Sequence, residues 1–237
     1  MAVSVLTQGA SGSNSGSYNT GSISPTANRL VVAIPYSTGA SGVFEAPTGL
    51  SGAGLTWVKI GEALAGANVN ERQLSAWGAL SGGSPSSGAV TISFAGTQNN
   101  CGWLIFETDA FNPSALDVAS LIVQFAAGTP ASTATPSVTL AAFADAVNNL
   151  CVSAFVTPVT TTFTAGSGSQ VGSTVDGTSP PTTMGVQVLT GEDTAPDCTF
   201  GGSGLCQGLA FEIDAGSGGG GGVAVPVFEH LYRQFRR

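Results

Sequence analysis

The sequence predicts an all-β fold: an antiparallel β-sandwich, with a jelly roll as the favoured topology and with an internal pseudo-repeat. The composition is rich in glycine and small residues, with 34 Gly among 237 residues and only 8% charged residues, which favours short strands and turns over helices. The 42% of hydrophobic residues can fill a core, unlike a disordered chain. About a dozen short alternating segments are separated by turn residues, as in sandwiches.

A ten-residue stretch occurs twice, as CGWLIFETDA at 101–110 and CQGLAFEIDA at 206–215, with six identical positions. Each copy alternates and then ends in carboxylates, which is typical of a central strand. A second pair, NRLVVAIPY at 28–36 and NNLCVSAFV at 148–156, matches in the same order. We therefore predict a duplicated unit, with halves of about 1–115 and 116–214 forming one sandwich domain, because an isolated half would expose an apolar face.

The strand candidates follow one another along the chain. In the first half we expect strands at 2–7, 29–35, 54–63, 72–80 and 89–96, followed by the first copy of the repeated stretch. Asn99-Asn100 is predicted to form the turn that separates the last two. The long glycine-rich connection 39–54 suits a Greek-key crossing. In the second half, 137–143, 148–156, 167–175 and the region 182–215 occupy the corresponding places.

The charge is distributed unevenly. Residues 1–222 contain three basic against 13 acidic residues, whereas the last fifteen contain three arginines and one glutamate. An acidic body argues against nucleic-acid binding by the domain. The basic C-terminal end predicts an electrostatic contact made by the tail.

The C-terminal 23 residues divide into two parts. The stretch 215–222 has the composition of a flexible glycine-rich linker. In 223–237, large apolar side chains recur at helical spacing, and arginines gather near the end, which predicts a short amphipathic helix. Such a helix is marginal alone, so we expect a docking tail that folds on a partner. The predicted partner-binding residues are Phe228, Leu231, Tyr232, Arg233, Phe235, Arg236 and Arg237.

The repeated Glu-x-Asp is the candidate for catalysis. Sandwich glycosidases use two carboxylates on neighbouring strand positions, and the laminarinase-like family has Glu-x-Asp followed by a second glutamate. Here ETDAFN and EIDAGS lack that glutamate, so Glu107 and Glu212 are interpreted as structural. The single histidine, His230, lies in the tail, and no Gly-x-Ser-x-Gly motif is present. We predict no catalytic residues, no cofactor and no enzyme activity.

The remaining reactive side chains have structural interpretations. The acidic stretch of Glu192, Asp193 and Asp197 favours a solvated loop over a calcium site, and no zinc-binding pattern occurs. For Cys198 and Cys206 two interpretations stay open: a disulfide across a hairpin, or buried thiols like Cys101 and Cys151. The tryptophans are expected to pack in the core instead of stacking on sugars; they are Trp57, Trp77 and Trp103.

No targeting or membrane signal is apparent. The stretch 1–12 lacks the basic and long apolar regions of a signal peptide. No segment approaches the ~18 apolar residues of a membrane span. We therefore expect synthesis in the cytoplasm and no membrane partner.

A resemblance to a known group of proteins is carried by six stretches: NRLVVAIPY, GLTWVKIG, QLSAWGAL, GAVTISFAG, CGWLIFETDAF and the C-terminal PVFEHLYRQFRR. They resemble tailed-bacteriophage virion proteins with jelly-roll or concanavalin-like sandwiches. The resemblance implies a multicopy structural component of the virion, whose partners are major capsid or tail proteins and other copies of the chain. It favours a capsid decoration protein attached by its C-terminal tail. The alternative is a glycan- or receptor-binding module of a phage appendage, with loops 39–54 and 191–204 as its rim.

Overall fold

The computed structural model describes residues 2–39, 45–63, 72–177 and 180–216, and within them it is an antiparallel β-sandwich, as predicted. One 3-10 turn, η2 (Ala119–Leu121), precedes β8. The first sheet contains β1 (Val3–Ser11), β2 (Ser15–Ile23), β3 (Leu30–Gly39), β4 (Gly49–Gly52), β5 (Val58–Ala63), β6 (Gln73–Leu80) and β7 (Gly88–Thr108). The second contains β8 (Ile122–Ala127), β9 (Ala131–Thr133), β10 (Leu150–Thr157), β12 (Ser169–Asp176), β13 (Thr182–Thr190) and β15 (Gly204–Ile213), and a small third sheet pairs β11 (Phe163–Ala165) with β14 (Cys198–Phe200).

Each half of the chain builds one sheet, and the two sheets have the same strand order. The first runs β1-β7-β3-β6-β5 and the second runs β8-β15-β10-β13-β12. Across the sandwich β1 contacts β12, and β5 contacts β8. In the two strand orders, β1 corresponds to β8 and β5 corresponds to β12. Each contact therefore becomes the other when the two halves are interchanged, so an approximate twofold axis relates the sheets. The internal pseudo-repeat predicted from the sequence is therefore present in the topology.

The strand registers of the two halves also agree. Leu30 lies opposite Thr108 in the first sheet, and their sequence counterparts Leu150 and Ile213 lie opposite each other in the second. The outermost pairs each contain a one-residue bulge, between Lys59 and Gly61 in β5 and between Gln170 and Gly172 in β12. A register repeated to the residue, bulge included, is the strongest sign that the halves share one structural plan.

Three apolar clusters follow from strand alternation. The central cluster lies between the sheets and includes Leu104 and Phe106 of β7 and Leu209 and Phe211 of β15. A second cluster lies on the outer face of the first sheet, under β2, β4 and the N-terminal half of β7. A third lies on the outer face of the second sheet, under β11, β14 and the segment 138–143. Both outer faces are thus covered by a smaller layer of strands.

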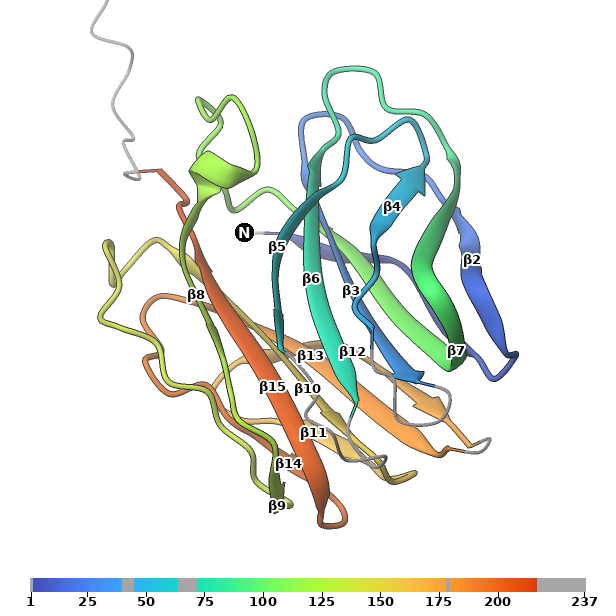
Figure 1. The fold of residues 1–237 in the computed structure, drawn as a ribbon. Helices are drawn as coiled ribbons and strands as arrows, with labels where there is room; N and C mark the ends of the chain where they lie inside the picture. Colours follow the sequence, from blue (N-terminus) through green and yellow to red (C-terminus); the bar gives the residue numbers. More distant parts are fainter. Residues whose placement is uncertain (1, 40–44, 64–71, 178–179, 217–237) are drawn as a thin grey trace, which may run out of the picture.

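Several of the predicted elements differ from the structure. No turn forms at Asn99-Asn100, because β7 continues through it as one long strand, the curved green strand beside β2 in Figure 1. Thr38 Oγ1 donates to Asn100 Oδ1 at 2.6 Å, Asn100 Nδ2 donates to the Pro180 carbonyl, and the register with β3 shifts at Asn99. β2 is absent from the predicted strands, since its polar SGSYNTGSI buries only every second or third residue. The predicted strand at 137–143 forms only an isolated bridge, between Ser137 and Asp197, and β4 lies within the predicted connection 39–54.

Candidate functional site

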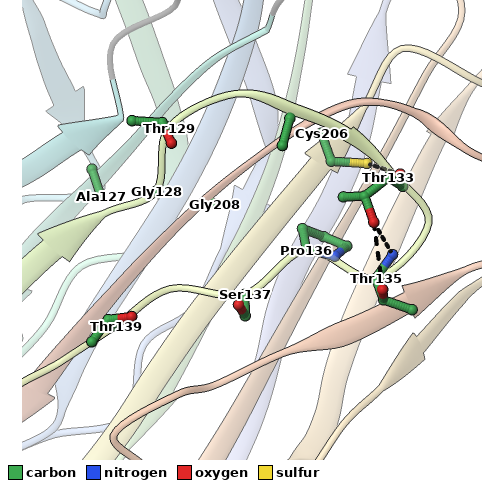
Figure 2. A pocket seen from close by; sticks show the side chains of 11 residues that line it. Ala127, Gly128, Thr129, Thr133, Thr135, Pro136, Ser137, Thr139, Cys206 and Gly208 are labelled. Atoms are coloured by element: carbon green, nitrogen blue, oxygen red, sulfur yellow. Dashed lines mark hydrogen bonds between the residues drawn. The ribbon is translucent and has the colours of Figure 1, made fainter.

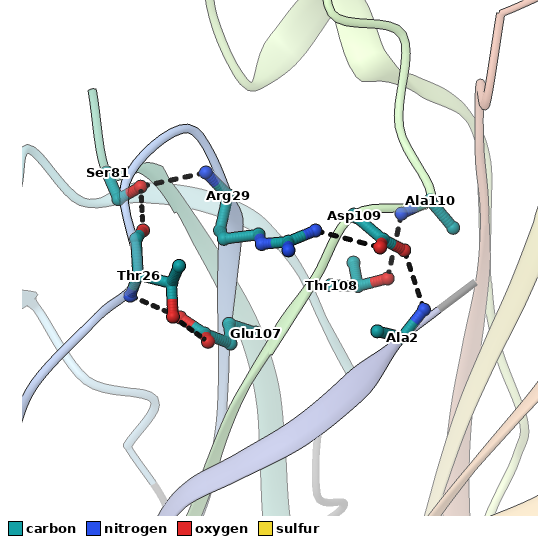
Figure 3. Close-up of polar contacts among 8 residues, drawn as sticks. All are labelled: Ala2, Thr26, Arg29, Ser81, Glu107, Thr108, Asp109 and Ala110. Carbon is teal, nitrogen blue, oxygen red and sulfur yellow. Dashed lines mark hydrogen bonds and ion pairs between the residues drawn. The ribbon is translucent and has the colours of Figure 1, made fainter. Parts of the chain in front are cut away.

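The first Glu-x-Asp closes the loop that enters β3 (Figure 3). Glu107 is 7% exposed, on the outer face of the first sheet. Thr26 donates to it twice, from its backbone N–H to Oε2 at 2.7 Å and from its hydroxyl to Oε1 at 2.6 Å. Ser81 Oγ donates to the Thr26 carbonyl and accepts the Arg29 N–H. The glutamate therefore fixes the chain before β3.

Glu212 has the corresponding position and task in the second half. It is fully buried and accepts from Gln124 Nε2 at 2.8 Å, the Ala144 N–H at 2.9 Å and Asn149 Nδ2 at 2.6 Å. Ala144 and Asn149 precede β10, as Thr26 precedes β3. In both halves, the carboxylate of the central strand thus holds the segment that enters the neighbouring strand.

The two aspartates of the repeat close the chain ends. Asp109 accepts from the Ala2 N–H at 2.6 Å and pairs with Arg29 at 2.9 Å. These two contacts, the Ala2 N–H first, lower the pKa of the Asp109 carboxyl below its usual value. Asp214 accepts from Asn112 Nδ2 and from the Gly216 N–H. Every carboxylate of the repeated motif is therefore engaged with donors of the framework.

The other sequence candidates also lie in the framework. Trp77 and Trp103 are buried, and Trp57 packs against the same outer cluster, so the expectation that they serve packing is confirmed. In the acidic stretch, Glu192 accepts from the Phe143 N–H, and Asp193 accepts from the Ala195 N–H. Within the described ranges no group of three metal-ligating side chains occurs, and no helix there is long and apolar enough to cross a membrane.

All four cysteines are buried free thiols, so Cys198 and Cys206 form no disulfide in this structure. The predicted hairpin between them is absent, because β14 pairs with β11 and the start of β15 pairs with β9. Cys206 Sγ instead donates to the Thr133 carbonyl at 3.0 Å. Burial raises the pKa of the Cys151 thiol to about 12, and it also raises the pKa of Cys206. Such thiols are poor nucleophiles.

A groove of about 520 Å³ crosses β15 near its start (Figure 2). One wall is the loop that continues β8 into β9, and the other is the returning segment 135–139. Gly208 and Cys206 of β15 line it beneath. Its rim bears the hydroxyls of Thr129, Thr133, Thr135, Ser137 and Thr139. Sequence reasoning missed this feature; the available signal was a glycine at 208 where the repeat has Trp103.

The predicted tail residues lie outside the described residues. These are Phe228, Leu231, Tyr232, Arg233, Phe235, Arg236 and Arg237. What the structure does show is the point from which the tail departs. Asn112 donates its backbone N–H to the Asp214 carbonyl at 2.8 Å, and the Ala215 N–H donates to Asn149 Oδ1. The chain is thus fastened to the sandwich as far as Gly216.

Comparison with known proteins gives no relative. No described protein family, no curated protein and no solved structure matches this chain.

Proposed function

We propose that this chain is a structural component of a bacteriophage virion, a decoration protein of the head surface attached by its C-terminal tail. The observation that supports it is the contrast at Gly216. Up to that residue the chain is a closed, acidic sandwich fastened through Asp214 and Asn112. Beyond it, a glycine run leads to an aromatic and basic segment of opposite charge.

The chemistry of the described residues agrees with a structural role. The carboxylates that could have served a glycosidase each accept framework hydrogen bonds, as described above for Glu107 and Glu212. A rigid sandwich with both outer faces covered is a suitable projecting module for a particle surface. A short amphipathic segment behind a linker can add affinity through many simultaneous attachments in a multicopy lattice.

The test is retention on purified particles of the phage that encodes the chain. Deleting 223–237, or replacing Phe228 and Phe235 by serine, should reduce the copy number per particle at least tenfold, measured by quantitative mass spectrometry. Gln234→Ser is the matched control, because it changes the same segment outside the apolar spacing; it should leave occupancy unchanged. Full occupancy after the deletion would refute attachment by the tail.

The competing function, glycan or receptor binding at loops 39–54 and 191–204, has less support. Aromatic faces are the usual platforms for sugar rings, and Trp77 and Trp103 are buried in the outer cluster. The large hydrophobic side chains exposed in the described part are five valines and Leu116. Saturable binding of the full chain on a glycan array, with unchanged particle occupancy after tail deletion, would favour this function instead.

A further inference from the structure

The connection between the two halves covers one seam of the sandwich, the one where the edge strands β5 and β8 meet. After β7 the chain passes through η2, the green coil at the upper end of β8 in Figure 1. Val118 and Leu121 of this connection are buried in the central cluster. A Cβ at Gly78 of β6 would lie 2.6 Å from Val118 Cγ1 and 3.3 Å from Ile60 Cδ1 of β5. Val118 therefore fills the space over Gly78 and closes this seam.

The other seam, between β1 and β12, contains a pocket of about 210 Å³ at the corresponding place. By strand register, Val188 of β13 is the counterpart of Gly78. The bulge residue Val171 of β12 is likewise the counterpart of Ile60 in β5. Val188 and Val171 both line the pocket. The pocket thus lies beside the place that Val118 occupies in the other seam, and the side chain of Val188 takes part of that volume.

Apolar side chains around this pocket remain partly in contact with solvent. β1 lines it with Val3, which is half-buried, and with Val5, which is 40% exposed. Val171 is half-buried, and no charged side chain belongs to the lining. Covering the pocket with one further aliphatic side chain would remove apolar surface from water on both sides, which is favourable.

Within the described residues, the β1–β12 seam has no counterpart of the covering connection. Asp109 donates its N–H to the Ala2 carbonyl, and Asp214 donates its N–H to the Leu121 carbonyl at 2.8 Å. Ala2 and Leu121, which precede β1 and β8, are therefore counterparts. Leu121 is fully buried, whereas Ala2 is small and exposed. In the covered seam the chain after Asp109 leads to Leu121, so the corresponding chain in the other seam is the one that continues after Asp214.

The sequence of that continuation keeps the spacing of the first half. The glutamate of the repeated stretch is followed after eleven residues by Val118-Ala119 in the first half, and after eleven residues by Val223-Ala224 in the second. Because an approximate twofold axis relates the two seams, a connection that spans one can span the other with the same number of residues. Val223 is thus the sequence counterpart of Val118.

We propose that Val223 covers the β1–β12 pocket of its own chain, as Val118 covers the space over Gly78. The chain is fastened to the sandwich as far as Gly216, through Asp214. A residue joined to its site by so short a connection has an effective concentration on the order of millimolar, which favours it over a second copy in dilute solution. The contact does not use the residues predicted to dock on a partner, so it does not depend on the proposed virion function.

The test is methyl NMR on the full-length chain with labelled valines. The methyl protons of Val223 should show NOEs to those of Val5 and Val171. Val223→Ser should shift the methyl signals of Val5 and Val171, because it removes the covering side chain. Ala224→Ser is the matched control: its counterpart Ala119 is exposed, so this change should leave the pocket signals in place.

Three results would overturn the proposal. The first is the absence of NOEs between Val223 and the valines of the pocket. The second is an equal response of the pocket signals to Val223→Ser and Ala224→Ser. The third is NOEs that arise only between differently labelled chains in a mixed sample, because Val223 would then come from a second copy. The loss of particle occupancy expected on replacing Phe228 and Phe235 would be unaffected by any of these, so the two proposals fail separately.

Discussion

Single residues show best how the repeat is used. Glu107 and Glu212 share the context Phe-Glu-x-Asp-Ala and occupy the same strand position, yet their partners differ. Thr26 satisfies Glu107 with one N–H and one hydroxyl, whereas Glu212 accepts only N–H donors from three residues. The sequence predicted a structural role from the missing second glutamate and from the presence of the motif in both halves. It could not predict the partners, since they lie 63 to 88 residues away along the chain.

This difference predicts unequal costs for the same substitution. In Glu107→Gln the new amide can donate to the Thr26 hydroxyl, which can also accept, so we expect a loss below about 1 kcal/mol. In Glu212→Gln, the new side-chain NH2 group faces another donor, the NH2 group of Gln124. The Gln124 amide cannot flip to present its oxygen instead, because that oxygen accepts the Ala141 N–H. We expect a loss of about 2–3 kcal/mol in the free energy of unfolding. Urea denaturation of both variants measures the costs, and equal losses would contradict this account.

At the scale of elements, alternation located strands well where one face is buried and the other is polar. It failed where a strand has few apolar residues on its buried face, as in β2, and where side chains hold a turn-like pair extended, as at Asn100. It also predicted a strand at 137–143, which forms only one bridge. The covering layers and the groove could not be predicted either. They depend on which segments pack on the outer faces of the two sheets, and alternation within one strand does not indicate that. On the groove floor, Phe155 covers Gly208, and the corresponding position in the first half is Pro35.

The repeated bulges predict a specific sensitivity to added volume. Gly61 follows the bulge in β5, where a Cβ would lie 2.5 Å from the ring of Phe125 in the opposite sheet. Gly61→Ala should therefore destabilise the fold by about 1–3 kcal/mol. Gly49→Ala is the control, since nothing lies within 4 Å of its Cβ position, and it should be neutral or stabilise by up to about 1 kcal/mol.

A double-mutant cycle identifies the cause of the Gly61 effect. If the ring is responsible, Gly61→Ala combined with Phe125→Leu should cost less than the two single losses added together, by about 0.5 kcal/mol or more. Thermal or urea unfolding of the four proteins gives the coupling energy. Strict additivity would mean that the alanine acts through the backbone of β5 and not through the opposite sheet.

At the scale of the whole molecule, each sheet needs the other. The central cluster takes Leu104 and Phe106 from one half and Leu209 and Phe211 from the other. A half that separated would expose this whole face to water, at about 25 cal/mol per Å² of apolar surface. The duplication therefore produces a single cooperative unit, although the chain contains two nearly equivalent sheets.

The sequence supplies separate probes for the two halves, which makes this cooperativity testable. All three tryptophans lie in the first half, between residues 57 and 103, whereas Cys151, Cys198 and Cys206 lie in the second and are buried free thiols. Because neither sheet can keep its apolar face buried alone, tryptophan fluorescence and pulsed thiol labelling should give one coincident urea transition. Labelling of Cys101 reports on the first half by the same chemistry and serves as the control. Reaction of the second-half thiols at lower urea than the fluorescence change would show that the second sheet opens first, and that the approximate twofold axis divides two folding units.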